Sequence, residues 1–251
     1  MAAALGVKFG LWPWQFGLGV LVVKAGLPVL IVSIILALVA LVLALVRAPR
    51  RGWPAALIAL LIPALAVGYL ASVRAKSADI PPIHDVATDT VDPPQFSPAV
   101  IAARQAVDAN PVASMSAPLS SQAAYQGPRF SKLAGRSLGE VGRRGYPGVR
   151  PLQLAVPPAA AYAAALAEAK ASGWELVSQN PDGGTIEATA ETFWFGFKDD
   201  VVVRIRPGAA GSTVDVRSTS RVGLSDLGAN AARIEAYLAG LDKRAPKASA
   251  S

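Results

Sequence analysis

The apolar positions of this chain first form two long, uninterrupted runs. Residues 27–46 and 54–73 contain no charged side chain, and a seven-residue turn with three arginines separates them. Each run holds 20 residues, and about 20 helical residues cross the hydrocarbon core of a bilayer. The pattern therefore predicts a two-helix transmembrane anchor over residues 27–73.

A shorter apolar run precedes the anchor. Residues 11–23 include Trp12 and Trp14, and tryptophan favours the headgroup zone of a bilayer. We therefore expect residues 1–26 to form an interfacial segment that leads into the first span.

Cations beside the spans predict the orientation of the anchor. Arg47, Arg50 and Arg51 lie in the shortest loop, whereas four cations on the opposite side are spread over three flanks. The counts are nearly balanced, but the density of the turn favours its placement in the cytoplasm. We therefore expect a multi-pass protein of a bacterial inner membrane, with its C-terminal domain in the periplasm.

Prolines dominate the pattern after the second run. Eight of them recur between residues 81 and 128, and proline excludes most regular structure. Residues 74–145 are therefore predicted to be a Pro/Ala-rich linker, with a helical turn near 97–108 and a mobile tether at 109–128. Residues 81–92 carry β-branched residues and clustered acids, so we expect them to dock onto the following domain.

Periodic patterns return in residues 146–244 and predict a globular α+β domain. The expected order is β-α-β-β-β-β-α, an antiparallel sheet with two packed helices behind an N-terminal transmembrane helical hairpin. The elements are a strand at 152–156, a helix from 157–158 to Gly173, strands at 174–179, 185–197, 201–206 and 213–221, and a helix after Ser225. Residues 245–251 are expected to be a disordered tail.

A simple hairpin through residues 207–211 sets the register of the last two strands. Arg204 then lies opposite Asp215, and Ile205 lies opposite Val214. The sheet would have one apolar side and one charged side. The last helix would bury Ala231, Ile234, Leu238 and Leu241 as one stripe.

Charge and composition narrow the classes of function. The chain carries 24 Lys and Arg against 17 Asp and Glu, one histidine and no cysteine. Disulfides, thiolate nucleophiles and cysteine-ligated metals are therefore excluded. Neither a glycine-rich nucleotide fingerprint, a nucleophile elbow nor zinc-ligand spacing occurs.

The stretch Arg129–Arg150 holds six cations against the single acid Glu140. One interpretation is contact with anionic lipid headgroups, worth about 1 kcal/mol per cation near the surface; the other is a solvated basic linker. Aromatic residues do not interleave with these cations before Tyr146, so nucleic-acid binding is not expected.

Two clusters of polar residues are candidates for chemistry. His84 and Asp85, with Asp89 and Asp92 nearby, could bind a divalent metal or orient a general base. One histidine is too few for a typical metal site, so we expect neither metal nor cofactor. Residues 217–230 combine arginines with a helix start, where a phosphate or carboxylate could bind; the alternative, which is favoured, is internal pairing of Arg217 and Arg221 with Asp215 and Asp226. The candidate ligand- or partner-binding residues are His84, Asp85, Asp89, Lys198, Arg204, Arg217, Arg221, Asp226 and Asn230.

Two further patterns have competing interpretations. Asp199 and Asp200 could be paired acids for hydrolysis, but a turn at residues 198–200 is favoured. The aromatic run at 193–197 could contact lipid, line a groove or pack in the core, and core packing is favoured. Ser225 is expected to cap the last helix, with Asp226 in its first turn.

Several uncommon strings occur together in this chain: residues 81–90, Tyr146-Pro147, 193–200 and 217–230. Together they resemble the family catalogued as domain of unknown function 1499, over about residues 78–243. The resemblance implies a membrane hairpin ahead of the domain, as in its proteobacterial branch, but no established activity. Other members begin the domain with a cysteine-containing segment, which residues 83–85 replace here.

Three hypotheses about function remain open from the sequence. The first is a non-enzymatic, membrane-tethered envelope domain that binds a small anionic ligand, a lipid or a partner protein. The second is a hydrolase or metal-dependent enzyme that uses His84 and Asp85. The third is a purely structural envelope protein.

Overall fold

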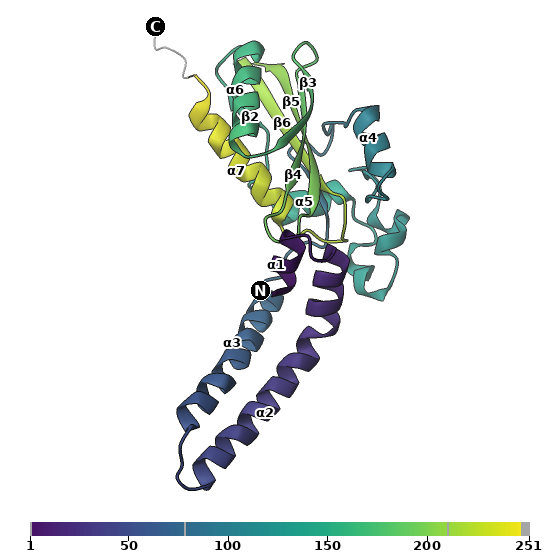
Figure 1. Cartoon of the computed structure of the whole chain (residues 1–251). Helices are drawn as coiled ribbons and strands as arrows, with labels where there is room; N and C mark the ends of the chain where they lie inside the picture. The colour runs from purple at the N-terminus through teal and green to yellow at the C-terminus, as the bar shows by residue number, and fades with distance from the viewer. Residues whose placement is uncertain (1, 78, 210, 247–251) are drawn as a thin grey trace. The chain divides into compact units, whose positions relative to one another are not determined.

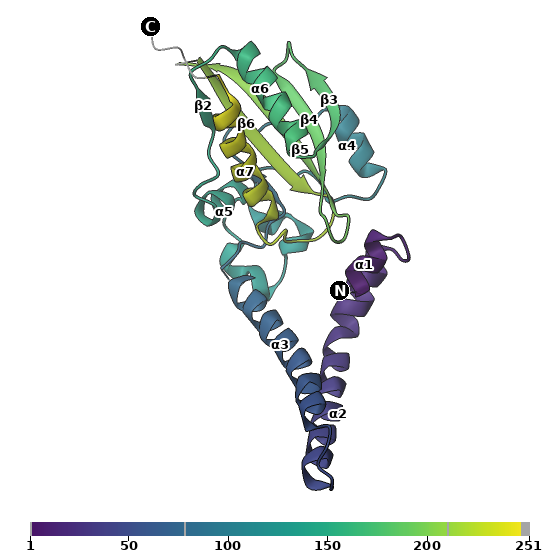
Figure 2. The same ribbon diagram turned by 60° about the vertical axis from the view of Figure 1, so that its left-hand side comes forward.

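The structure is a computed structural model that describes residues 2–77, 79–209 and 211–246. The chain divides into two compact units. One contains the residues up to Asp79 together with the loop Thr192–Gly196, and the other contains Ile80–Glu191 and the chain from Phe197 onward. Figures 1 and 2 show the helices of the first unit and the sheet of the second in two views.

The first unit is built around a hairpin of two long helices, α2 (Gly26–Val46) and α3 (Trp53–Ser77), which lie side by side (Figure 1). The most apolar 18-residue windows of these helices have mean hydropathies of 3.4 and 2.3, and only 6% and 11% of those windows are buried. Both helices are thus long and apolar enough to cross a membrane, with apolar side chains left outward as in a lipid-facing helix.

Two short helices precede the hairpin. Helix α1 spans Ala2–Lys8, and a ten-residue π-helix spans Gln15–Lys24. The π-helix covers most of the third apolar run of the sequence and is much shorter than α2 or α3. Its length is that of a lead-in segment rather than of a span.

The described residues of the second unit form a six-stranded antiparallel sheet with the order β1-β6-β5-β4-β3, and β2 also pairs with β6. The strands are β1 (Asp85–Ala87), β2 (Leu152–Leu154), β3 (Glu175–Asn180), β4 (Thr185–Glu191), β5 (Lys198–Gly208) and β6 (Gly211–Ser220). From β2 onward the predicted order β-α-β-β-β-β-α is confirmed. The predicted register is confirmed too, because Arg204 pairs with Asp215 and Ile205 with Val214.

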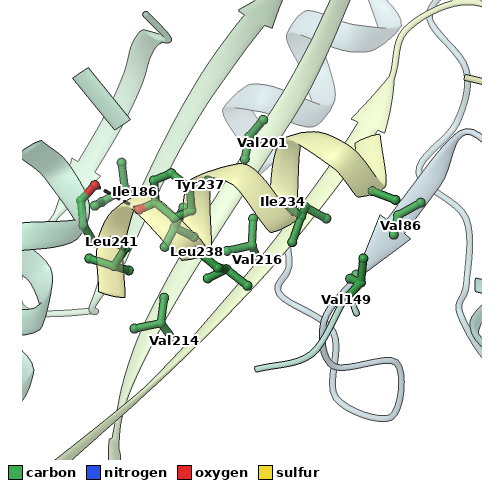
Figure 3. Close-up of a cluster of buried hydrophobic side chains, with 14 of the residues drawn as sticks. Val86, Val149, Ile186, Val201, Val214, Val216, Ile234, Tyr237, Leu238 and Leu241 are labelled. Carbon is green, nitrogen blue, oxygen red and sulfur yellow. Dashed lines mark hydrogen bonds between the residues drawn. The ribbon is translucent and has the colours of Figure 1, made fainter. Parts of the chain in front are cut away.

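Helices α6 (Pro158–Ala171) and α7 (Ala229–Arg244) cover one face of this sheet (Figure 2). Small side chains let α6 approach closely, and Ala165 and Ala169 are fully buried. The predicted stripe of α7 is buried against the sheet, and Figure 3 shows Ile234, Leu238 and Leu241 among the strand valines. This face is therefore a conventional apolar core.

Aromatic residues complete this core. The rings of Trp174 and Tyr237 stack with their centroids 4.7 Å apart. The buried Tyr237 hydroxyl donates a hydrogen bond to the carbonyl oxygen of Ala165 at 2.9 Å, which ties α7 to α6. Burial raises the pKa of Tyr237, so this hydroxyl stays protonated and remains a donor.

The opposite face of the sheet is covered by residues that were expected to be linker. Helix α4 spans Pro98–Gln105. Ser97 is its N-cap, because the Ser97 hydroxyl accepts a hydrogen bond from the Val100 backbone N–H, and Pro98 suits the first turn. Phe96 and Val100 pack against Val202 on the charged side of the sheet. The charged side is therefore an interior rather than a solvated surface.

Residues 109–128 differ from the mobile tether that their composition predicts. Short 3₁₀ turns at Leu119–Ser121, Ala123–Tyr125 and Pro128–Leu133 lead into helix α5 (Leu138–Gly145). Leu119 is fully buried within the main core. Proline excludes long elements here but not short turns that each bury one side chain. The folded unit thus begins at Ile80 rather than at residue 146.

Other boundaries also differ from expectation. Residues 198–200 belong to β5 instead of a turn, and strand β4 ends at Glu191 before the aromatic run. Helix α7 begins at Ala229 after Gly228, whose φ of +86° suits glycine, so Ser225 is not its N-cap. The predicted tail at 245–251 falls from residue 247 onward outside the described residues.

Candidate functional site

A buried ion pair joins the first strand to the charged face of the sheet. Arg217 donates from Nε to Asp85 Oδ1 at 3.0 Å and from Nη2 to Oδ2 at 2.7 Å. The same Nη2 donates to the carbonyl oxygen of Ala113 at 2.7 Å. Both charged side chains are at most 1% exposed. Arg217 and Asp85 therefore hold each other and the segment at Ala113, not an external anion.

A second buried cluster surrounds Asp200. Arg104 and Arg221 both pair with its carboxylate, the latter at 2.7 Å, and Thr189 Oγ1 donates to it at 3.0 Å. Burial raises the pKa of Asp200. The hydrogen bonds and charges of Arg221 and Arg104 together lower the pKa by more, so it lies below the usual value of 3.8. Asp200 is therefore a charged anchor for α4.

The third cluster lies toward the outer rim of the same face. Arg204 and Arg206 both reach Asp215, at 3.2 and 2.7 Å, and both reach Asp92. Asp89 accepts hydrogen bonds from two backbone amides of its own turn. Burial raises the pKa of Asp89, whereas these bonds and the two arginines lower it to a net value below 3.8.

The acidic pair of β5 points to opposite faces. Asp200 faces Arg104, whereas Asp199 pairs with Arg233 of α7. Lys198 is exposed at the strand start. Asp199 and Asp200 thus serve different clusters, and their separation by the sheet removes the arrangement that joint hydrolysis requires.

Asn230 ties the start of α7 to the end of β6. Its side-chain amide donates to the carbonyl oxygen of His84 at 3.0 Å and to Ser220 Oγ at 2.9 Å, and its oxygen accepts from Ser218 at 2.6 Å. The Asp226 carboxylate accepts a hydrogen bond from the backbone N–H of Asn230 at 2.9 Å. Burial raises the pKa of Asp226 and outweighs these hydrogen bonds. The hydrogen bond from Asn230 to the His84 carbonyl oxygen holds the His84 backbone in place.

A cavity of about 700 Å³ opens beside His84, a volume typical of small-molecule sites. We call it the His84 recess. Apolar side chains dominate its wall, and the polar groups are few. The residues that line it are His84, Asn110, Pro111, Ala113, Ser114, Ala117, Ser121, Gln122, Ala123, Ala124, Gly223 and Leu224.

The His84 ring is buried in this wall and only partly engaged. Its Nδ1 lies 3.4 Å from the carbonyl oxygen of Leu224, a long contact. Within the described part of the chain, neither His84 Nε2 nor Gln122 Nε2 has a hydrogen-bond partner, although both atoms are buried. A buried polar atom without a partner costs free energy, which a ligand with a complementary group would offset.

Tyr125, three residues after Gln122, adds a third buried polar group, because its hydroxyl has no hydrogen-bond partner among the described residues. Burial first, and then the charges of Asp85 and Asp226, raise the pKa of Tyr125 to about 12. The hydroxyl is therefore a neutral donor at physiological pH.

Local sequence explains why the recess forms. Ile83 is fully buried and Asp85 is locked by Arg217, so His84 between them is held on a fixed backbone. Gly223 has a φ of +88°, a left-handed conformation that suits glycine and lets the chain turn after β6. The backbone N–H of Asn110 donates a hydrogen bond to the Arg221 carbonyl oxygen at 2.7 Å, which joins the segment at residue 110 to the chain after β6.

Of the candidate ligand- or partner-binding residues named from the sequence, His84 alone lines the recess. Asp85, Arg217 and Asn230 hold its surroundings, and Asp89 and Arg204 lie in the rim cluster. Leu224 lies in the wall and belongs to the run 217–230 that was singled out, whereas Asn110 and Gln122 were missed. Asn110 and Gln122 lie in the stretch whose Pro/Ala/Ser composition resembles a tether, and no spacing in it signals a site.

Metal chemistry finds no donor set here. Across the described residues, no group of three or more His, Asp or Glu side chains is placed to hold a metal ion. Asp85 could serve His84 as an orienting carboxylate only by leaving Arg217, because that guanidinium engages both of its oxygens.

Comparison with known proteins places the chain in a family. The sequence profile of one family matches residues 85–241, which is more than half of the chain. This range contains the sheet, helix α6, all but the last three residues of α7, and the wall of the recess apart from His84. No curated protein matches the chain. The chain belongs to the family described as Protein of unknown function (DUF1499).

Proposed function

We propose that the folded unit is a non-enzymatic binding module, held at a membrane by α2 and α3, and that its ligand occupies the His84 recess. The single observation that carries the proposal is the mostly apolar recess of about 700 Å³ that His84 lines. A ligand that fills it gains apolar burial. The buried Nε2 of His84, which has no hydrogen-bond partner among the described residues, is a polar group beside that ligand.

The lining residues indicate the class of ligand. Neither lysine nor arginine lines the recess, and Arg217 and Arg221 are paired with Asp85 and Asp200. A strongly charged anion would therefore meet no cation in the wall. An amphiphile with an apolar body and one polar group, such as a single-chain lipid, fits these side chains better than a small anion.

We place the module in a bacterial inner membrane, with the turn between α2 and α3 in the cytoplasm and the folded unit in the periplasm. The three arginines of that turn support this orientation. The stretch Arg129–Arg150 would add contact with anionic headgroups. Its Arg143 and Arg150 are exposed, while Arg144 also pairs with Glu140 at 2.9 Å.

Native mass spectrometry of fragment 80–251 with oleic acid as the probe tests the proposal. The fragment contains the whole core of the folded unit. We expect one oleic acid to remain bound to the wild type and to be lost from Ala117→Trp, because the indole would fill the recess. The control Val177→Trp adds the same bulk on exposed β3 and should retain the probe.

Equal binding by all three proteins, or binding by none of them, would contradict the proposal. Thermal unfolding of each variant separates a filled recess from a damaged fold, since both substitutions lie outside the buried core.

A further inference from the structure

The loop between β4 and β5 exposes aromatic side chains. Phe193 is 67% exposed and Trp194 is 44% exposed, and their rings meet edge to face with centroids 5.0 Å apart. Core packing, the favoured interpretation of this run, is therefore wrong for these two residues. Lys8 contacts Phe193, with its Nζ 3.6 Å from the ring centroid and 3.1 Å from the carbonyl oxygen, but two adjacent aromatic side chains remain largely exposed.

The register of the sheet places the two strand ends that carry this loop at one end of the folded unit. Glu191 pairs with Lys198 at the base of the loop, and Asp199 pairs with Ser220 on the next strand. The backbone N–H of Ser220 donates a hydrogen bond to the carbonyl oxygen of His84 at 2.9 Å. The base of the aromatic loop and the point where the chain enters the folded unit thus lie at the same end of the sheet.

The length of chain before that point is short. Helix α3 ends at Ser77 and the folded unit begins at Ile80. Three residues span at most about 10 Å. The last turn of α3 carries Arg74 and Lys76, which are suited to the headgroup zone. The first residues of the folded unit are therefore connected by a short stretch of chain to the end of α3 that would lie at the bilayer surface.

We propose that Phe193 and Trp194 insert into the interfacial zone of the same bilayer that holds α2 and α3. Aromatic side chains with Lys8 in contact and an exposed Lys198 at the base of the loop match the chemistry of that zone, where rings lie at headgroup depth and cations meet lipid phosphates. This contact does not depend on what the recess binds.

The absence of cysteine from the sequence gives a direct test. A nitroxide is attached to Trp194→Cys in the full-length chain, reconstituted in vesicles of phosphatidylcholine and phosphatidylglycerol. Electron paramagnetic resonance then compares its collisions with lipid-soluble oxygen and with a water-soluble nickel chelate. The matched control is Val91→Cys, an apolar residue that is 87% exposed in the turn held by Asp89, toward the other end of β5.

We expect the ratio of oxygen to nickel collisions to be several-fold higher at position 194 than at position 91. A ratio that favours nickel equally at both positions would overturn the proposal, because the loop would then lie in water. Low collision rates with both reagents at position 194 would also overturn it, because protein rather than lipid would cover the loop. Thermal unfolding of both labelled chains verifies that each is folded.

Discussion

The two faces of the sheet are both buried, but they are buried by different chemistry. Helices α6 and α7 cover one face with apolar side chains, as in most α+β domains. Residues 93–113 cover the other face, where Asp85, Arg104 and Arg217 are each at most 3% exposed. The first cover is a packed core, and the second is a set of ion pairs that tie separate segments to the strands.

This difference determines how each cover is specified. An apolar side chain can pack against several neighbours, so the core tolerates conservative changes of shape. A buried arginine requires one carboxylate at one place, and its loss leaves a charge without a partner. The charged face therefore fixes where the irregular segment 81–113 lies, and through it the wall of the His84 recess.

Removal of one charge from the charged face should have the largest effect. Asp85→Ala leaves the buried Arg217 guanidinium unpaired, and we expect the free energy of unfolding to fall by about 3–5 kcal/mol. On the apolar face, Ile234→Val removes one methyl group and should cost about 0.5–1.5 kcal/mol. Urea unfolding of fragment 80–251, followed by circular dichroism, measures both changes.

Two controls sharpen this comparison. The double variant Asp85→Ala with Arg217→Met should be more stable than Asp85→Ala alone, because the unpaired charge is gone. Asp92→Ala removes a rim carboxylate that is 65% exposed and should cost less than about 1 kcal/mol. If Asp85→Ala costs no more than Asp92→Ala, the charged face is solvated and the comparison fails.

Acid should weaken the charged face by a smaller amount. The pKa of Asp200 is lowered in the folded state, so its ion pairs add stability above the usual value of 3.8, and that stability is lost as the pH falls through the lowered pKa. Asp226 has a raised pKa and acts in the opposite direction. We expect Asp200→Asn to flatten the acid loss of stability and Asp226→Asn to steepen it, as measured by urea unfolding at each pH. The same slope in both variants would show that neither carboxyl governs the acid response.

The regular part of the fold could be predicted from the sequence, because periodicity reports directly on which side chains face a core. The stripe of α7 and the pairing of Arg204 with Asp215 are cases of this kind. The anchor helices also follow from length and apolarity alone. These inferences need only local information.

The site could not be predicted in the same way. Asn110 and Gln122 line the recess together with His84, but they lie in irregular turns, which have no sequence period. The partner of Arg217 lies 132 positions away in the chain. Asp85 and Arg217 were both singled out from the sequence, but internal pairing was expected with Asp215 and Asp226 instead. A single sequence shows which charges exist, whereas only the fold shows which of them meet.

Residues 81–145 form an integral layer that closes the charged face and builds the recess. Hydrogen–deuterium exchange of the full-length chain tests this arrangement through the backbone amides of Asn110, Leu119 and Gly139. These amides donate to the carbonyl oxygens of Arg221, Arg136 and Met115 at 2.7, 2.8 and 2.8 Å. We predict that they exchange far more slowly than an unstructured chain, as amides protected by folding do. Exchange at the unstructured rate would show that this segment is a tether after all, and the recess would have no wall.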